Sequence, residues 1–558
     1  MNDPDRTDRC QPTQATSRSG RPVPLGRAVL ALLALWTAFA ALAALTCAQW
    51  KECWLLGAAL ACGGILFVHV IGSDRSALWL AAFLVGAALV RIWYLAAVRV
   101  DLSGDEAQYW DWSRNMDWCF FSKGPGVAAC IWVTRRLLGD TVLGVRAGAT
   151  ILSFLSSLVL YALGVRLKDR RTGLQAAALF QVVPIYAFCG VGITTDPPLI
   201  FLWLVAMLLF HRVWTCPSWA GWILLGGAVG LGVLTKYTMA LFCLPAFILL
   251  LVHPAGRRQL RGPMPYAGVL VSLLLVLPLL IWNSQHGWAN VLHNAGHTKL
   301  QAGLRASSVN FGLFVGGQLG VVTPLLLIFM TWALIRRRRE DPFSFCFAIP
   351  LMGLFLLKSV QGEVLTNWAL VCYLPGLIAF CAYYGQGLAR FNVHVRRLVR
   401  AGLAIAVVGS IALHAVILIP FPRTLDPLKK IRRGAVEVGR DVSAVAATLP
   451  PNRFILSDNY ALSSLLAFYV EGQPRTYCVN LGRRFNQFDF WPTFHHLRHY
   501  DAILVLSGDL PMPPELEERF ASWEKRPLVV RTPRPKEYSI FICRDFQGMP
   551  VVLPSKYN

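Results

Sequence analysis

Charged residues are scarce in this sequence, and acidic residues are the scarcest. Asp, Glu, Lys and Arg together make up 15% of the 558 residues, whereas an average soluble domain contains roughly 25%. Hydrophobic residues make up 55%, which is more apolar surface than one soluble core can bury. The composition therefore excludes a soluble enzyme and indicates a protein that has lipid as its solvent.

Two further features are missing. No C-x-x-C pair occurs among the 14 cysteines, so the spacing typical of zinc and redox sites is absent. Most of the cysteines lie inside apolar runs, where they act as small hydrophobic residues. The chain also has no internal repeat, whereas many transporters are built from repeated halves. These absences argue against a metal-cluster protein and weaken the case for a transporter.

Basic residues outnumber acidic residues by 53 to 30, for a formal net charge of +23. In a soluble protein this excess would suggest nucleic acid as a partner. Here the Lys and Arg residues form short clusters between apolar runs, which is typical of membrane topology. Residues 420–558 hold 19 basic and 14 acidic residues, so no nucleic-acid partner is expected.

The apolar runs predict about thirteen membrane-spanning helices, because a bilayer core needs about 20 apolar residues per helix. The first run is too long for a signal peptide and lacks a cleavage site, so it is expected to remain as an uncleaved helix. The predicted fold class is a polytopic α-helical membrane protein with a small C-terminal extracytoplasmic α/β domain. The spans are expected near residues 29–48, 54–71, 77–98, 141–165, 173–190, 198–213, 219–235, 237–252, 266–282, 309–334, 343–359, 368–389 and 401–419.

Five clusters of Lys and Arg fall on one side of this count, and the positive-inside rule makes that side the cytoplasm. The predicted domains are a cytoplasmic arm at 1–28, a transmembrane domain at 29–419 with an outer loop at 99–140, and an extracytoplasmic α/β domain at 420–558. The multi-pass chain is expected in the cell inner membrane, with its C-terminal domain on the periplasmic side. Residues 126–138 within the outer loop are predicted to form an amphipathic helix in the membrane interface.

The C-terminal segment alternates strand-like and helix-like runs. Strands are expected at 454–457, 502–506, 528–530 and 538–542, and helices at 462–470 and 514–523. Cys478 and Cys543 lie in this segment, and an oxidising compartment would permit them to pair.

Carboxylates at the outer helix ends are candidates for catalysis. Asp105 and Glu106 are adjacent, and either could act as a general base, although such a pair is equally typical of a helix N-terminus. Asp196 precedes Pro197, which is also the pattern of an ordinary helix start. The sequence leaves both interpretations open.

The basic residues at the outer helix ends require an explanation, because the positive-inside rule places most Lys and Arg residues on the cytoplasmic side. Lys123, Arg146 and Lys236 either extend toward the interface along the lipid or bind an anionic group such as a lipid phosphate. His293 and His297 have the spacing to share a helix face and bind metal, but no second carboxylate lies near them in the sequence. The metal ligands therefore remain unknown, with Glu106, His293 and His297 as candidates and a divalent metal as a possible cofactor.

Several motifs in order resemble those of the GT-C membrane glycosyltransferases. They are Gly104-Asp-Glu-Ala-Gln-Tyr-Trp-Asp-Trp-Ser-Arg114, Phe121-Ser-Lys-Gly-Pro125, Gly144-Val-Arg146, Thr195-Asp-Pro-Pro-Leu199, Leu234-Thr-Lys-Tyr-Thr238 and Asn367-Trp368. The resemblance covers roughly residues 77–420 and is strongest to bacterial members of the dolichyl-phosphate-mannose protein mannosyltransferase superfamily, which includes the lipid A aminoarabinose transferases. Two apolar helices precede the span that normally comes first in that group, and the metal-binding Glu/His pair of one branch has no clear equivalent.

The resemblance implies transfer of a sugar from a polyprenyl-phosphate carrier to a lipid A-like glycolipid, a glycan or a protein at the outer face of the membrane. It assigns catalysis to Asp105, with Glu106 beside it, and to Asp196, and it assigns donor phosphate binding to Lys123. Arg146 and Lys236 lie at outer helix ends like Lys123 and are expected to neutralise the departing phosphate with it. Substrate binding is expected at Tyr109, Tyr237, His286, Glu363 and Asn367. A lipid or sugar transporter or flippase is the alternative from another class, and an acyl or phosphoryl transferase would suit the same residues.

Overall fold

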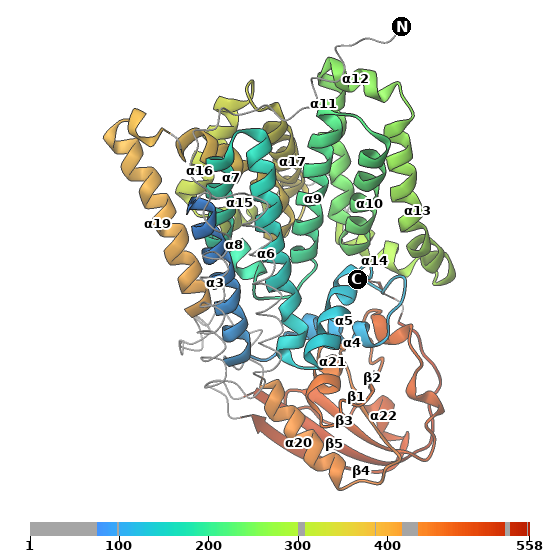
Figure 1. The fold of residues 1–558 in the computed structure, drawn as a ribbon. Helices are drawn as coiled ribbons and strands as arrows, with labels where there is room; N and C mark the ends of the chain where they lie inside the picture. Colours follow the sequence, from blue (N-terminus) through green and yellow to red (C-terminus); the bar gives the residue numbers. More distant parts are fainter. Residues whose placement is uncertain are drawn as a thin grey trace. The chain divides into compact units, whose positions relative to one another are not determined.

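The computed structural model describes residues 75–97, 100–298, 307–385, 387–415, 434–530, 536–554, 556 and 557. The spans expected at 29–48 and 54–71 lie outside these residues. The chain divides into two compact units, whose elements are labelled in Figure 1. The membrane unit comprises residues up to 97, 146–277 and 304–414, and the sheet unit comprises residues 98–145, 278–303 and 415–558.

Seven helices in the described part of the chain are long and apolar enough to cross a membrane, or up to nine if each of two bent pairs is one span. This confirms a polytopic α-helical membrane protein, whereas the count of thirteen stays a prediction. The seven are α3 (Arg75–Ala97), α6 (Val142–Leu167), α9 (Asp196–Thr215), α13 (Met264–Gln285), α17 (Pro342–Gln361), α18 (Leu370–Phe380) with its flanking turns η5 (Thr366–Ala369) and η6 (Cys381–Gly385), and α19 (Val393–Ala415).

The span expected at 309–334 is not one continuous helix. Two helices occupy this run, α15 (Ser308–Val322) and α16 (Pro324–Arg337), and they meet at 94°. Thr323 has φ 78, outside the helical region, and Pro324 cannot donate a backbone hydrogen bond. The helical ladder therefore ends at this point and restarts in a new direction.

One other expected span is also divided, and a second is helical over its expected length but is followed by a sharp bend. The run at 173–190 forms α7 (Arg170–Val182) and α8 (Pro184–Cys189), because the residue before a proline disfavours helical geometry and Val183 is extended. The run at 237–252 forms η3 (Tyr237–Phe242) and α11 (Cys243–Val252), followed by α12 (Pro254–Leu260) at 112°. Short helices α10 (Trp219–Thr235) and η7 (Leu388–Arg390) complete the unit.

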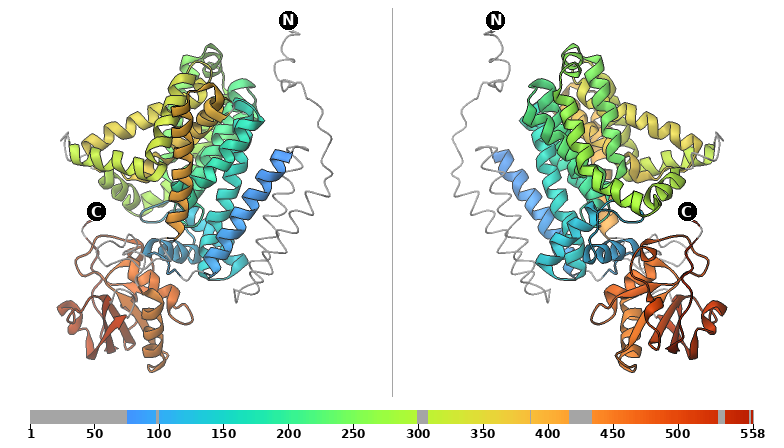
Figure 2. Two further views of the ribbon diagram at one scale, coloured as in Figure 1. Left: turned by 90° about the vertical axis from the view of Figure 1, so that its left-hand side faces the viewer. Right: turned by 90° about the vertical axis from the view of Figure 1, so that its right-hand side faces the viewer.

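The membrane unit has a buried helix and two exposed ones. Every residue of α18 is buried, and its main helix partners are α7, α9, α16 and α17. By contrast α13 and α19 are largely exposed although they are apolar, which is the pattern of helices that face lipid. Figure 2 shows the long helices of this unit lying side by side. Close packing of α10 on α13 requires Gly226, since a Cβ there would lie 2.0 Å from the oxygen of Gly268.

The sheet unit contains a five-stranded sheet of order β2-β1-β3-β5-β4. The strands β1, β2 and β3 are parallel, and β5 pairs antiparallel with both β3 and β4. The strands are β1 (Arg453–Ser457), β2 (Thr476–Cys478), β3 (Asp501–Ser507), β4 (Phe520–Val530) and β5 (Lys536–Phe546), with helices α20 (Ala435–Ala447), α21 (Tyr460–Tyr469) and α22 (Pro514–Glu517) and short turns η8 (Gln487–Asp489) and η9 (Phe494–His496).

Successive side chains along a strand point to opposite faces of the sheet. Those of β1 and β3 therefore pack into two separate hydrophobic cores, one on each face. Ile455 and Ile503 pack with α20 and α21, whereas Leu456 and Leu504 pack with aromatic residues on the other face. The α/β prediction for this segment is therefore confirmed. The helix expected at 514–523 is wrong in its second half, because α22 ends at Glu517 and β4 begins at Phe520.

Cys478 and Cys543 do not pair. Both are buried free thiols, on strands β2 and β5, which are separated by β1 and β3. Three steps of about 4.8 Å place them far beyond the roughly 7 Å between Cα atoms that a disulfide can span.

Two further segments of the sequence belong to the sheet unit. The predicted outer loop contributes α4 (Gly104–Arg114) and α5 (Gly126–Leu138), and the chain after α13 contributes α14 (Ala289–Thr298). The helix expected at 126–138 is confirmed with the same bounds. It exposes the apolar side chains of Trp132, Val133 and Leu137, and its position in the membrane interface stays a prediction.

Candidate active site

The two adjacent carboxylates at the start of α4 have different environments. Ser103 caps the helix by accepting a hydrogen bond from Glu106 N at 3.2 Å, and the Glu106 carboxylate accepts one from Ser103 N at 2.9 Å. This reciprocal capping box buries Glu106, whereas Asp105 is exposed and accepts a hydrogen bond from the Tyr460 hydroxyl at 3.1 Å. Of the pair, Glu106 stabilises the helix, whereas the Asp105 carboxylate is exposed.

Asp105 sits where α4 meets the C-terminal part of the sheet unit. A Cβ on Gly104 would lie 2.4 Å from the Cβ of Ala461 on α21, so this contact requires glycine. The backbone on either side is also tied to the C-terminal part, since Leu102 N donates to the Tyr469 hydroxyl at 2.7 Å and Asp101 accepts from Ala435 N at 2.7 Å. These contacts fix the first turn of α4, which carries Asp105.

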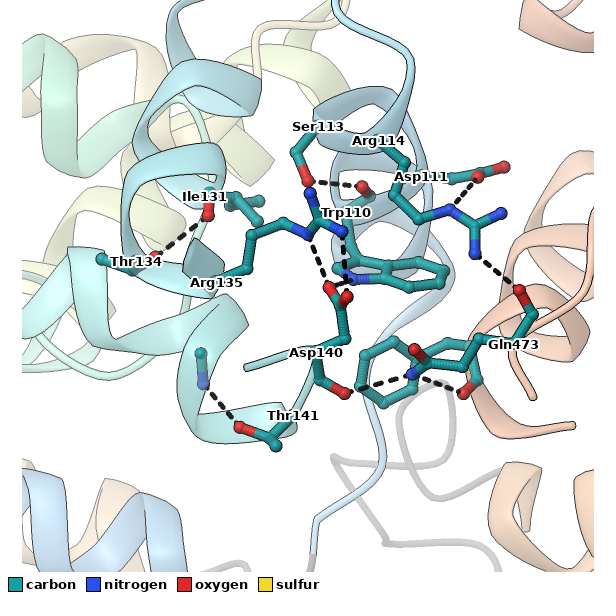
Figure 3. A network of polar contacts seen from close by, with 12 residues as sticks. Trp110, Asp111, Ser113, Arg114, Ile131, Thr134, Arg135, Asp140, Thr141 and Gln473 are labelled. Atoms are coloured by element: carbon teal, nitrogen blue, oxygen red, sulfur yellow. Dashed lines mark hydrogen bonds and ion pairs between the residues drawn. The ribbon is translucent and has the colours of Figure 1, made fainter. Parts of the chain in front are cut away.

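The last turn of α4 is held by a polar network around Asp140 (Figure 3). Trp110 Nε1 donates to Asp140 at 2.7 Å, and Arg135 of α5 makes two further hydrogen bonds to the same carboxylate at 2.5 and 2.9 Å. Although partial burial raises the pKa of Asp140, the hydrogen bonds from Arg135 and Trp110 lower it more. Gln473 of the C-terminal part bonds Asp140 O at 3.1 Å and accepts from Arg114 at 2.7 Å. The network therefore joins α4, α5 and the C-terminal part.

Asp111 of α4 is a buried carboxylate beside this network. It faces Arg114 Nε at 3.3 Å. Burial raises the pKa of Asp111 to about 6, against the smaller lowering effects of Arg114 and Arg475. The sheet unit therefore favours the neutral form of this side chain more than an unfolded chain would.

We expect Asp111→Asn to stabilise the protein at pH 7 to 8 and to leave it unchanged near pH 4. The pKa is higher in the folded state than the ordinary value, so the charged carboxylate costs stability above about pH 6, and this cost disappears as the pH falls and Asp111 takes up a proton. Asparagine resembles the neutral form at every pH. Thermal unfolding of both proteins across pH 4 to 8 measures the gap between them. A gap that fails to narrow toward pH 4 would contradict the raised pKa of the buried Asp111 carboxyl.

Lys123 lies half-buried in a loop between α4 and α5. The loop is surrounded by aromatic rings, with Phe121 against His293 at 4.6 Å and against Phe490 at 5.9 Å between ring centroids. His293 Nδ1 bonds the Tyr557 carbonyl at 2.9 Å. His286 stacks on Trp282 at 4.0 Å and lies 5.9 Å from Phe490. The structure thus brings Lys123, His286 and His293 into one aromatic-lined region of the sheet unit.

The membrane unit carries a compact group of its own. Lys236, the C-cap residue that follows α10, pairs with Asp196 at 2.6 Å, and Asn367 of η5 donates to the other oxygen of Asp196 at 2.8 Å. The Asp196 side chain is 8% exposed and that of Lys236 is 11% exposed. Three predicted residues from widely separated segments therefore meet, and the positive charge of Lys236 is matched by a carboxylate.

The remaining predicted residues are dispersed. Arg146 is buried on α6 in the membrane unit, and Tyr237 is half-buried at the start of η3. Tyr109 is buried on α4 with its ring 5.1 Å from that of Trp112, whereas Glu363 is exposed. The structure does not bring Glu363 into either group.

The metal candidates do not form a cluster. Among the described residues, no three His, Cys, Asp or Glu side chains lie close enough together to hold an ion. Glu106 is engaged in the capping box and His293 bonds Tyr557, while the His297 side chain lies outside the described residues. Glu106 and His293 therefore each make a contact that stabilises the fold.

A second group of buried polar side chains in the membrane unit is centred on Arg91. In the sequence, only the position of this one charged residue inside an apolar run indicates the group. Arg91 of α3 is 7% exposed and donates to Ser153 at 3.2 Å and to both oxygens of Gln181. A Cβ on Gly190 would lie 2.6 Å from this guanidinium group. Arg91 thus packs against the turn that leads into α9 and Asp196.

Comparison with known proteins identifies the family. Residues 122–282 match the family model described as dolichyl-phosphate-mannose-protein mannosyltransferase. The chain is 30% identical over 403 residues to the lipid A galacturonosyltransferase RgtD of Rhizobium johnstonii, a match that covers 69% of this chain and 81% of RgtD. The chain belongs to the GT-C superfamily of membrane glycosyltransferases. It is an integral membrane enzyme that transfers a sugar.

Other GT-C glycosyltransferases show more distant similarity. An undecaprenyl phosphate-α-4-amino-4-deoxy-L-arabinose arabinosyl transferase of Serratia proteamaculans is 25% identical over 336 residues, which cover 53% of this chain and 59% of the relative. The apo crystal structure of ArnT from Cupriavidus metallidurans superposes with a TM-score of 0.59 at 18% identity, covering 84% of this chain and 98% of ArnT. The fold of this GT-C glycosyltransferase is therefore that of ArnT.

Proposed function

We propose that this glycosyltransferase moves a sugar from a polyprenyl-phosphate carrier to a lipid A-like glycolipid at the outer face of the cytoplasmic membrane. The observation that carries the proposal is the similarity to a lipid A galacturonosyltransferase along 81% of that protein's length. Structural support comes from ArnT, whose fold this chain shares and which has been crystallised with undecaprenyl phosphate. The C-terminal α/β domain then lies on the extracytoplasmic side, in agreement with the five basic clusters.

The chemistry assigns a distinct task to Asp105. When an acceptor hydroxyl oxygen attacks the anomeric carbon, the bond from that carbon to the phosphate oxygen breaks and its electron pair leaves with the phosphate. Asp105 takes the hydroxyl proton as the attack proceeds, since its carboxylate is exposed while that of Glu106 is occupied by the helix cap. If the acceptor is an ionised phosphate, no proton needs removal and Asp105 serves to orient the sugar.

The cations have separate tasks. Lys123 of the sheet unit is assigned to the donor phosphate, whose negative charge grows as it departs and is stabilised by a fixed positive charge; the same role for Arg146, which belongs to the membrane unit, stays a prediction. Lys236 is paired with Asp196 at 2.6 Å, so its charge is already balanced. We therefore assign the Asp196–Lys236–Asn367 group to holding the substrate by hydrogen bonds rather than to neutralising the phosphate.

Mass spectrometry of envelope glycolipids and polyprenyl-phosphate sugars tests the function in a strain that lacks the gene. We expect one sugar to disappear from a glycolipid and its lipid-linked donor to accumulate, and the mass of that donor distinguishes a uronic acid from an aminopentose. A copy of the gene with wild-type sequence restores the glycolipid, whereas a copy with Asp105→Asn, made to equal protein level, does not. An unchanged set of glycolipids with no accumulated donor would contradict the proposal.

A further inference from the structure

The loop that carries Lys123 is held by amide side chains from two other segments of the chain. The loop turns back on itself, with Phe120 N donating to Lys123 O at 3.0 Å. Asn290 of α14 donates to Phe120 O at 2.6 Å. On the other side, Phe121 N donates to the Gln487 side-chain oxygen at 2.6 Å. The backbone next to Lys123 is thus fixed from α14 and from the C-terminal α/β domain.

Gln487 itself is rigidly supported. It begins the turn η8, is 1% exposed, and lies 366 residues from Phe121 in the sequence. Asp489 caps the same turn by accepting from Asn486 N at 2.8 Å, and Arg483 binds the Asp489 carboxylate through two hydrogen bonds of 2.7 and 2.8 Å. Arg483 also donates to the carbonyl of Cys478, at the end of the edge strand β2, at 3.0 Å. The hydrogen bonds of Arg483 and Asp489, together with the backbone of the short turn η8, therefore connect the sheet to the Lys123 loop.

The position of this loop matters because a lysine ammonium is a point charge on a flexible stem. Its location relative to a phosphate is set largely by the backbone that carries it, and a functional group is effective only when its support is rigid to about 0.5 Å. Loss of the Gln487 oxygen would leave the buried Phe121 N–H without its acceptor, which is unfavourable because a buried donor then lacks both protein and water partners. The loop can recover this energy only by moving.

We propose that Gln487 is a positioning residue for Lys123, so that the C-terminal α/β domain sets the affinity of the enzyme for its phosphate-linked lipid donor. This inference rests on the proposed function, since it takes Lys123 as a ligand of the donor phosphate. The α/β domain then has a part in donor binding through the loop, in addition to any contact with the acceptor.

Gln487→Leu tests the proposal with little change in shape. The Phe121 ring keeps its contacts with His293 and Phe490, so we expect the variant to fold. Binding of undecaprenyl phosphate to the purified full-length protein in lipid nanodiscs is the readout. We expect the Kd to rise about tenfold, which corresponds to loss of one buried hydrogen bond, while the KM for the acceptor stays unchanged.

Val442→Ala is the matched control. Val442 of α20 is fully buried in the core of the same domain and has no part in the hydrogen bonds that hold the loop. This substitution should lower the unfolding temperature at least as much as Gln487→Leu and leave the Kd for undecaprenyl phosphate unchanged. A loss of binding in Val442→Ala equal to that in Gln487→Leu would show that general destabilisation is the cause and would overturn the proposal.

A double-mutant cycle with Lys123→Ala identifies the route of the effect. If Gln487 acts through Lys123, then Gln487→Leu changes the Kd less than twofold in the Lys123→Ala background. The positioning role would be overturned if Gln487→Leu raised the Kd tenfold in both backgrounds. It would also be overturned if Gln487→Leu left the Kd unchanged when Lys123 is present. Failure of the unmodified protein to bind undecaprenyl phosphate would instead overturn the proposed donor class, so the two failures are distinguishable.

Discussion

Replacement of Asp105 by asparagine is expected to reduce sugar transfer to a hydroxyl acceptor by a factor of roughly 10²–10⁴, the usual contribution of a general base. Asparagine keeps the size of the side chain and can still accept a hydrogen bond from Tyr460, but it cannot take a proton. The capping box of α4 is made by Ser103 and Glu106, so the substitution does not disturb the helix start. The measurement is the turnover of purified enzyme with lipid-linked donor, together with its unfolding temperature.

Asp101→Asn is the matched control for this experiment. Asp101 lies four positions earlier, and its carboxylate accepts from Ala435 N, a contact that an asparagine oxygen can also make. We expect this variant to retain near-normal turnover. Near-normal turnover of Asp105→Asn itself would show that Asp105 only orients the sugar, as expected for an acceptor that is an ionised phosphate.

The second large effect is expected at the buried ion pair of the membrane unit. Lys236→Met leaves the Asp196 carboxylate buried without its cation, and breaking a buried pair in this way typically costs about 3–5 kcal/mol. We expect a large fall in the unfolding temperature and complete loss of transfer. The double variant Asp196→Asn/Lys236→Met carries no unpaired charge and should recover most of the stability while remaining inactive.

The exposed pair of Lys525 and Asp509 supplies the control. Its Nζ and Oδ1 atoms are also 2.6 Å apart, but the two side chains are 30% and 64% exposed. Such surface pairs contribute about 0–1 kcal/mol, so Lys525→Met should leave both stability and transfer nearly unchanged. Recovery of transfer in the double variant would show that Asp196 and Lys236 serve stability alone.

Much of the fold is predictable from the sequence where local physics decides it. The run at 126–138 is bounded by Pro125 and Gly139, and the structure begins and ends α5 within one residue of them. The bend at Thr323 was not predictable from hydropathy, because the apolar run continues through it. Pro324 is a signal for such a break, but prolines inside α17 and α18 are tolerated, so proline alone does not decide between a kink and a break.

In the candidate site, too, some features have a signal in the sequence and others have none. The Ser103-x-x-Glu106 spacing is that of a capping box and is a signal for the helix-capping role of Glu106, but the adjacent carboxylates alone left both roles open until the structure separated them. The contacts of Asn290 and Gln487 had no such signal. Amide side chains follow no periodic pattern, and their partners on the Lys123 loop are 170 and 366 residues away. Only the tertiary structure brings these groups together.

The burial of α18 has a consequence for how the protein is made. A ribosome delivers the chain to the membrane from the N-terminus onward, and the helices that make the main contacts with α18, namely α7, α9, α16 and α17, are all synthesised before it. The site that receives α18 is therefore complete when this helix leaves the translocation machinery, and α18 has no need to wait in lipid for a later partner. Nascent chains that end just before α18 would leave the surfaces that α18 covers on these four helices without their partner.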